Sequence, residues 1–196
     1  MMSNDNTLPP VPQRVESQRL LIRPSTRADA PYLKRWWNDP QVTTPGGNQA
    51  GMQYDDDDME TWFRRYVDGR AHSTHFVICL REPTEQPIGE FYIASDDRPG
   101  CVGCALIIGE PSLWGKGYGS EALAAYAEAL FATGTCEAIR IDMRVDNVAA
   151  QRMARKVGFA VEHVWANGQF QTMLLSRAAF ELHKVRQAEI AAGLRR

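Results

Sequence analysis

The sequence has few cysteines, almost no net charge and no long apolar run. Four cysteines in 196 residues are too few and too scattered for a disulfide scaffold, so we expect reduced thiols. The 22 basic and 24 acidic side chains leave a net charge of −2, which excludes the basic surface typical of proteins that coat nucleic acid or anionic membranes. No segment reaches about 18 consecutive apolar residues, and residues 1–14 lack the apolar stretch of a secretory signal. These absences predict a cytoplasmic protein with neither a nucleic-acid nor a membrane partner.

A metal site is not expected either. Cys101 and Cys104 form a C-x-x-C pair, but no second pair and no close histidine pair completes the ligand set of a zinc site. Gly100 and Gly103 instead favour a turn that leads into a strand. We therefore interpret both cysteines as structural.

Length and composition fit one folded domain. Hydrophobic residues make up 44% of the chain and charged residues 23%, which is close to the balance of soluble globular proteins. A chain of 196 residues is long enough for one full-sized core. We predict a flexible tail over residues 1–14 and a single domain over residues 15–196.

Strands and helices alternate along the chain, which predicts an α/β fold. β-Favouring runs predict strands over residues 18–24, 74–80, 87–94, 101–109 and 138–145, and a final hairpin with Asn167-Gly168 in its turn. A helix is predicted over residues 28–38, after a capping box of Thr26 and Asp29. Further helices are predicted over residues 56–67, from the segment after WGKGYG up to residue 133, and over residues 147–157 and 178–192. A mobile loop rich in glycine, proline and polar residues is expected over residues 43–53, and such loops often border a ligand site.

A glycine-rich turn, WGKGYG, lies between a predicted strand and a predicted helix. Gly115, Gly117 and Gly119 allow the backbone to approach a phosphate closely, and the helix dipole favours negative charge at that point. The turn matches neither the G-x-x-x-x-G-K-[ST] pattern of nucleotide hydrolysis nor the dinucleotide fingerprint G-x-G-x-x-G. The pattern therefore predicts an anion site of another kind.

The wider context of this turn resembles a known family. WGKGYG followed by SEAL, with DNVAAQRMARKVGF further on, is similar to the acetyl-CoA signature of the GCN5-related N-acetyltransferase (GNAT) family, [QR]-x-x-G-x-[GA] with a later N-x-x-A-x-x-x-x-x-K-x-G-F helix. The resemblance covers about residues 19–177. IGEPSLWGKGYG looks most like the aminoglycoside 6′-N-acetyltransferases, and RWWNDP resembles that branch and the ribosomal-protein N-terminal acetyltransferases.

The resemblance implies a fold and a site for acetyl-CoA, the expected cosubstrate. The implied fold is an α/β (α+β) GNAT fold, whose mixed and mostly antiparallel sheet is flanked by helices and splays between the strands at residues 101–109 and 138–145. The preceding strand is implied to pair with pantetheine, the turn to hold the pyrophosphate, and an asparagine to begin the second CoA helix. In this chain these positions are Leu106, Ile107 and Ile108; Gly115, Lys116, Gly117, Tyr118, Gly119 and Ser120; and Asn147.

The chain also departs from the family pattern. Trp114 stands where the general signature has glutamine or arginine, and Ala150 where the ribosomal-protein branch tends to have serine. Ala154 replaces a tyrosine that protonates the leaving thiolate in many members, and Ala105 lies where the aminoglycoside branch tends to have an aspartate. Because the thiol of CoA is about as acidic as that of cysteine, it can leave as a thiolate without a dedicated acid.

An acceptor amine arrives protonated, so a carboxylate or a water relay must take its proton before attack on the thioester. Asp142 matches an acidic position near the substrate amine in the aminoglycoside branch, and we predict it as the group that binds the amine or accepts its proton. A strand-end cap is the alternative role of Asp142. Glu90 and Glu110 are the other acidic candidates on the substrate side.

An acidic run and several aromatic residues have two interpretations each. Asp55, Asp56, Asp57 and Asp58 open a predicted helix, where they either stabilise its first turn or attract a polycationic substrate. Trp36, Trp37 and Trp62 recur near helical spacing, so we expect them in the core rather than as a substrate platform. His72 and His75 flank a strand start, and we expect them to be incidental.

Together these observations predict an acetyl-CoA-dependent N-acetyltransferase without a metal. Its expected acceptor is a small cationic amine, an aminoglycoside-type antibiotic by analogy with the nearest branch, and transfer is expected to be direct, in a ternary complex. Two alternatives stay open: acetylation of a protein N-terminus or a polyamine, and a CoA-binding module that has lost turnover. The chain is expected to be a monomer or a homodimer.

Overall fold

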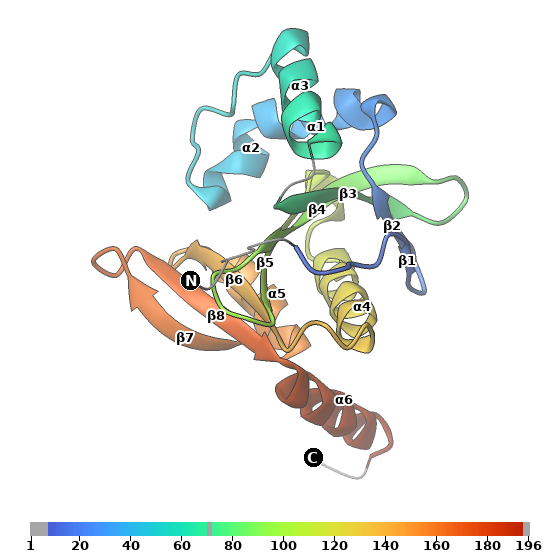
Figure 1. The fold of residues 1–196 in the computed structure, drawn as a ribbon, viewed down its shortest axis with the longest axis vertical. Coiled ribbons are helices and arrows are strands. Elements are labelled where there is room, and N and C mark those ends of the chain that lie inside the picture. The colour runs from blue at the N-terminus through green and yellow to red at the C-terminus, as the bar shows by residue number, and fades with distance from the viewer. Residues whose placement is uncertain (1–7, 70–71, 194–196) are drawn as a thin grey trace, which may run out of the picture.

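In the computed structural model, residues 8–69 and 72–193 are described, and they form one twisted sheet with helices on both faces (Figure 1). The sheet has eight strands in the order β1-β2-β3-β4-β5-β6-β8-β7. The strands are β1 Val15–Glu16, β2 Leu20–Pro24, β3 Ser73–Leu80, β4 Gln86–Ser95, β5 Cys101–Ile108, β6 Ala138–Arg144, β7 Ala160–Trp165 and β8 Phe170–Ser176. Neighbouring strands run antiparallel except β5 and β6, which are parallel, as the mixed sheet of the predicted fold requires.

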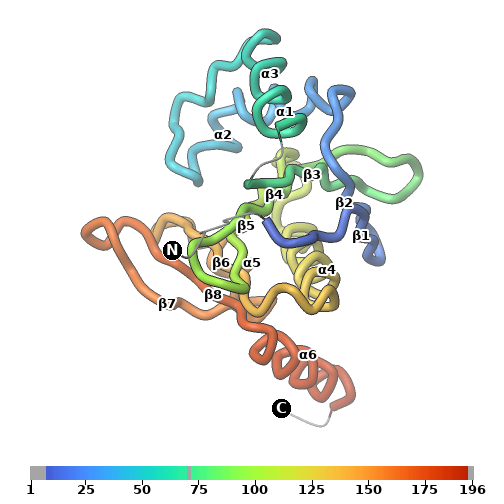
Figure 2. Tube along the Cα trace, viewed as in Figure 1, coloured from blue at the N-terminus to red at the C-terminus, as the bar shows by residue number. Residues whose placement is uncertain are grey.

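The helices divide into three groups along the chain. α1, α2 and α3 gather above the strands in Figure 1, α4 and α5 pack against the sheet, and α6 projects from the opposite end, as the Cα trace in Figure 2 also shows. Their bounds are α1 Ala30–Asn38, α2 Pro40–Thr43, α3 Asp56–Trp62, α4 Tyr118–Ala132, α5 Val148–Val157 and α6 Arg177–Ala191. Within residues 8–69 and 72–193, no helix is long and apolar enough to cross a membrane.

Two apolar cores lie on the two faces of the sheet. On the α4 face, buried side chains of α4 such as Leu123 and Tyr126 pack on Phe76 and Phe91 from β3 and β4. A smaller core on the α1–α3 side contains both Trp36 and Trp37, which confirms the expectation that they are core residues. Trp62 is only partly buried against this smaller core.

β5 and β6 separate after a short paired stretch. Their register runs through Cys101↔Ala138, Val102↔Ile139 and Gly103↔Arg140 and then stops, although both strands continue. The rest of β5 therefore has a ladder only on its β4 side. This is the predicted splay between residues 101–109 and 138–145.

Most predicted elements are confirmed, and the differences are local. The capping box of Thr26 and Asp29 is present, and the final hairpin turns through Asn167 and Gly168, both with positive φ. The loop predicted over residues 43–53 is partly helical, because Asp39 accepts a hydrogen bond from the Gln41 amide (2.8 Å) and starts α2 at Pro40 rather than only ending α1.

Part of the predicted tail over residues 1–14 contacts the domain. Residues 1–7 lie outside the described residues. Leu8 and Val11 pack against the larger core, and the Tyr126 hydroxyl donates a hydrogen bond to the Pro12 carbonyl (3.0 Å). Residues 8–14 therefore lie on the domain instead of extending from it.

Candidate active site

The glycine-rich turn forms a cradle of backbone donors at the start of α4. Gly115 has φ of 74° and Gly117 has φ of 85°, a left-handed conformation that glycine adopts without steric cost. The first helical hydrogen bond runs from the Glu121 amide to the Gly117 carbonyl (3.0 Å). The amides of Tyr118, Gly119 and Ser120 precede it and are left without helical acceptors, so they can bind an anion.

The three glycines of the turn have different roles. A Cβ on Gly115 would meet no heavy atom within 4 Å, so this position opens to solvent. A Cβ on Gly119 would lie 2.9 Å from the Met153 sulfur, so Gly119 permits the close packing of α4 on α5. The open side of the cradle is therefore at Gly115.

Positive charge lies beside the cradle. A Cβ built on Gly117 would be 3.6 Å from a guanidinium nitrogen of Arg19 and 3.9 Å from Nζ of Lys156. Arg19 is held there by Glu121 (2.6 Å), and it also donates to the Lys116 carbonyl (3.2 Å). Partial burial opposes ionisation of Glu121, yet hydrogen bonds from Ser17 and Arg19 lower its pKa.

Sequence reasoning missed Arg19, because its contacts with the turn depend on β2 lying next to the start of α4. The only sequence signal is a basic residue at the start of a predicted strand, which is common. The charge of Arg19 and Lys156 fits a diphosphate at the cradle.

The free edge of β5 leads from this cradle into the splay. Leu106, Ile107 and Ile108 pair with β4 on one side and have no β6 partner on the other. Trp114, the departure from the family signature, donates its indole N–H to the Ile108 carbonyl (2.7 Å) and so fixes the chain between β5 and the turn.

Asn147 caps α5 at the other side of the splay. Its side-chain oxygen accepts from the Ala150 amide (3.1 Å), and its Nδ2 donates to the Pro45 carbonyl (3.1 Å). Asn147 thus joins α5 to the segment after α2. Ala154, where the family resemblance implies a tyrosine in many members, is fully buried in the core and has no hydroxyl.

Asp142 lies on the open face of β6. Its neighbours Ile141 and Met143 point into the core, whereas the Asp142 side chain is 38% exposed. The carboxylate accepts a hydrogen bond from the Thr172 hydroxyl (2.6 Å) and faces Arg140 at 3.5 Å. These partners are side chains of β6 and β8 rather than amides beyond the strand end, so the geometry does not support a strand-end cap.

Glu90 is buried on the same face, two strands from β6. It accepts from Nε1 of Trp37 (2.8 Å) and contacts Nδ1 of His75 (3.2 Å). The His75 ring stacks on Tyr92 (5.3 Å between centroids) and meets the edge of Trp62 (4.8 Å). The expectation that His75 is incidental is therefore corrected, because the β3–β4 register places it beside Glu90 among aromatic rings.

The Glu110 carboxylate is bound by side chains of α1. It forms an ion pair with Arg35 and accepts from Nε1 of Trp36 (2.9 Å). These contacts fix α1 against the end of β5, next to Gly109, where a Cβ would lie 2.2 Å from the Trp36 ring. The structure thus gives Glu110 a packing role at this position.

The acidic run divides between capping and pairing. Asp55 and Asp58 form a reciprocal capping box at the start of α3 (2.9 and 3.1 Å). Asp56 forms an ion pair with Lys34 on α1 (2.6 Å). Helix capping therefore accounts for two of the four carboxylates, and Asp57 is exposed in the same turn.

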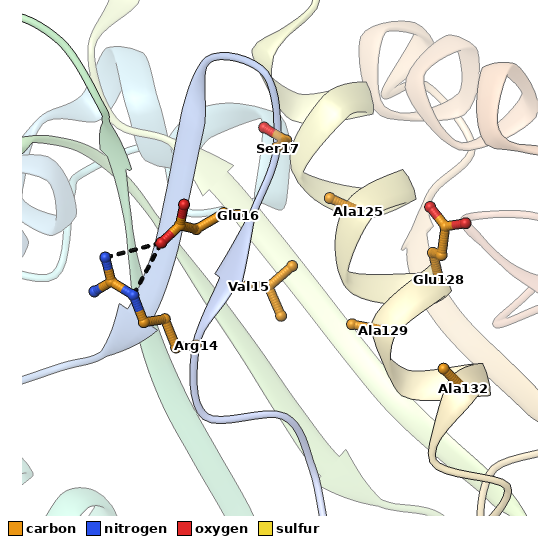
Figure 3. Close-up of a pocket in the computed structure, with 8 residues that line it drawn as sticks. All are labelled: Arg14, Val15, Glu16, Ser17, Ala125, Glu128, Ala129 and Ala132. Atoms are coloured by element: carbon orange, nitrogen blue, oxygen red, sulfur yellow. Dashed lines mark hydrogen bonds and ion pairs between the residues drawn. The ribbon is translucent and has the colours of Figure 1, made fainter.

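Hollows elsewhere on the surface do not contain the predicted acceptor residues. Figure 3 shows a groove between β1 and α4. It is lined by Arg14, Val15, Glu16, Ser17, Ala125, Glu128, Ala129 and Ala132. The arrangement of cradle, free β5 edge and Asp142 is distinct from this groove.

A comparison with protein families finds a match over most of the chain. The family described as "Acetyltransferase (GNAT) domain" matches residues 19–160. The chain belongs to the GNAT acetyltransferase family. It is therefore an N-acetyltransferase of GNAT type. A comparison with curated protein sequences finds no match.

Solved structures share the GNAT fold at low sequence identity. AAC(6′)-Ib in complex with ribostamycin and coenzyme A is 24% identical, with a TM-score of 0.71 over 84% of this chain and 97% of that one. Spermidine N-acetyltransferase from Vibrio cholerae with CoA and spermine is 17% identical (TM-score 0.68, 84% and 99% covered). Mycobacterium smegmatis RimJ with CoA-disulfide is 16% identical (TM-score 0.74, 93% and 95% covered).

Proposed function

We propose that this acetyltransferase moves the acetyl group of acetyl-CoA to a primary amine of an aminoglycoside-type cation, by direct transfer in a ternary complex. The observation that carries the proposal is the splay between β5 and β6, which has a donor cradle at its mouth and Asp142 on the open face of β6. The cradle fits the diphosphate of acetyl-CoA, and Asp142 fits a cationic acceptor.

The residues around the splay fit acetyl-CoA. The amides at the start of α4, with Arg19 and Lys156 beside Gly117, provide donors and charge for a pyrophosphate. The free edge of β5 offers backbone groups to the amides of pantetheine, and an N–H from this edge can stabilise charge on the thioester oxygen. The proposal keeps Leu106, Ile107 and Ile108 as the strand segment that pairs with pantetheine. It also keeps Asn147 as the residue that begins the second CoA helix.

Different residues of the protein then have different roles in the reaction. Asp142 binds the ammonium and takes its proton, which leaves a neutral amine to attack the thioester carbon. Ala154 supplies no acid, so the thiolate leaves at its own acidity, which is close to that of cysteine. The buried Glu90 and the exposed Asp57 provide negative charge on the acceptor side.

The test is acetyl-CoA-dependent thiol release with a panel of aminoglycosides, polyamines and short peptides with free N-termini. We expect release with an aminoglycoside, and we expect Asp142→Asn to reduce kcat by about 100-fold while CoA binding, measured by calorimetry, is unchanged. Glu110→Gln is the matched control, since Glu110 is already held by Arg35 and Trp36. Full activity of Asp142→Asn would remove this residue from the reaction.

The panel also decides between acceptors. Solved relatives include a spermidine acetyltransferase and RimJ at similar TM-scores, so the fold alone does not choose an amine. Release only with polyamines or peptides would replace the aminoglycoside proposal, and silence with every amine would favour a CoA-binding module.

A further inference from the structure

A row of polar side chains crosses three strands beside Asp142. In the sheet register, Asp142 of β6 lies opposite Thr172 of β8, and Thr172 lies opposite His163 of β7. The Thr172 hydroxyl is 2.6 Å from Oδ1 of Asp142 and 3.4 Å from Nε2 of His163. A single hydroxyl therefore joins the proposed proton acceptor to an imidazole.

A β-bulge creates this row. β7 pairs Val161 with Met173 and then His163 with Thr172, so Glu162 is an extra residue in β7. Without the bulge, Glu162 would oppose Thr172, and His163 would point to the other face of the sheet. The insertion of one residue thus turns an imidazole toward Asp142.

Glu162 lies beside the imidazole. Its Oε2 lies 3.5 Å from Nδ1 of His163, and Arg98 holds the same carboxylate at 2.8 and 3.0 Å. Thr172 donates its single hydroxyl proton to the ionised Asp142 in this structure. With the imidazole proton on Nδ1, the lone pair of Nε2 can accept that hydroxyl proton once Asp142 is itself protonated. His163 is 57% exposed and Thr172 is buried, so the row connects a sheltered hydroxyl to solvent.

Acetyl transfer from a thioester to an ammonium needs a path by which a proton can leave the site. The nitrogen loses two protons as the C–N bond forms, and the thiolate released from the broken C–S bond takes up one. One proton must therefore leave the site in every turnover. We propose that Thr172 and His163 form the path by which Asp142 returns this proton to solvent, an inference that rests on the proposed acetyl transfer.

The number of protons is conserved along the path. The protonated Asp142 carboxyl donates to Oγ1 of Thr172, the hydroxyl proton of Thr172 passes to Nε2 of His163, and the imidazolium releases a proton to water. The imidazole then returns to its Nδ1–H form and the Thr172 hydroxyl turns back to Asp142 before the next turnover. The charged groups that face this path come from β6, β7 and the segment after β4, and they are Arg140 at Asp142, Asp96 at Arg140, and Glu162 and Arg98 at His163.

The first test is independent of turnover. The ¹⁵N shifts of the His163 ring report which nitrogen carries the proton, and they are measured in Asp142→Asn, whose side-chain amide can donate to Thr172 as the protonated carboxyl would. In this variant we expect the Nδ1–H tautomer, with an Nε2 shift that changes when Thr172→Val is added. An Nε2–H tautomer that is insensitive to Thr172→Val would overturn the path, because Nε2 could not then accept from the hydroxyl.

The second test is kinetic, with the best amine of the panel. Thr172→Val removes the hydroxyl at nearly constant volume, and Thr172→Ser retains it. We expect Thr172→Val and His163→Ala each to reduce kcat at least tenfold with an unchanged KM for acetyl-CoA, and we expect the double variant to be no slower than either single one. Thr172→Ser should keep most of the activity.

Imidazole rescue excludes a merely structural role. Millimolar imidazole should restore His163→Ala but not Asp142→Asn. Wild-type rates in His163→Ala would refute the path while leaving acetyl transfer in place. Silence of the wild-type enzyme with every amine would instead refute the proposed function, and the path with it.

Discussion

Gly109 is a position where the structure predicts a large effect of a single methyl group. It follows β5 directly, and a Cβ at this residue would lie 2.2 Å from Cγ and Cδ2 of Trp36. The Trp36 ring is fully buried and its indole N–H is bonded to Glu110 (2.9 Å), so the ring has no free direction in which to move. Gly109→Ala must therefore displace α1 or break that hydrogen bond.

The magnitude follows from the two costs. Overpacking a well-packed core costs about 1–3 kcal/mol, and leaving a buried polar partner unsatisfied costs about 1–3 kcal/mol more. We expect Gly109→Ala to reduce the free energy of unfolding by about 4 kcal/mol, which for a chain of this length lowers Tm by about 10 °C. Gly46→Ala is the matched control, because a Cβ there meets nothing within 4 Å, and it should be neutral or stabilising by less than about 1 kcal/mol.

The assay is urea unfolding followed by circular dichroism, which does not depend on the altered tryptophan environment. Trp36→Leu should partly relieve the clash, so Gly109→Ala should cost less in that background than in the wild type. If Gly109→Ala unfolds within about 0.5 kcal/mol of the wild type, the reasoning from ring contact is refuted.

Two further predictions concern charged groups. Arg19→Ala should raise the Kd for CoA about tenfold in calorimetry by removing a cation beside the cradle, whereas Arg14→Ala, away from the cradle, should leave the Kd unchanged; equal values for both variants would contradict the diphosphate assignment. Burial alone raises the pKa of Asp29, but hydrogen bonds from Arg23 and Thr26 lower it below its ordinary value. The ionised Asp29 therefore stabilises the fold above the unfolded pKa of about 3.9, and this stabilisation is lost as the pH falls through the lower folded pKa. Urea unfolding should show Asp29→Asn less stable than the wild type at pH 6 by a margin that shrinks below pH 3, and a constant margin would disprove the linkage.

Local sequence patterns correctly predicted the elements that surround the site. The order of strand, glycine-rich turn and helix is confirmed by β5, Gly115–Gly117 and α4, because turn chemistry and helix capping depend on residues near in sequence. The splay between β5 and β6 was also expected, although from the family resemblance rather than from the residues themselves.

The missed features depend on contacts between distant segments. Arg19 reaches the cradle only because β2 lies beside α4, and His75 reaches Glu90 only through the β3–β4 register. His163 depends on a single extra residue in β7, and a shift of one residue moves a side chain to the opposite face of the sheet. A period-two pattern in the sequence cannot show such a bulge, because β7 is exposed along its whole length and carries no apolar alternation that would fix its register.

The substitution at Ala154 and the polar row at Asp142 bear on the same proton balance. With a tyrosine at position 154, a protein hydroxyl would return a proton to the thiolate, and that hydroxyl would have to be reprotonated. With alanine there, buried in the core, the protein supplies no acid at this position. In the proposed reaction water passes one of the two amine protons to the thiolate, and the other proton leaves by a separate route. A carboxylate that stayed protonated after one turnover could not accept the next amine proton. In the proposed reaction, Asp142 therefore needs a connection to solvent that works while substrate covers its exposed side. Thr172 and His163 approach Asp142 from the side of β8 and β7.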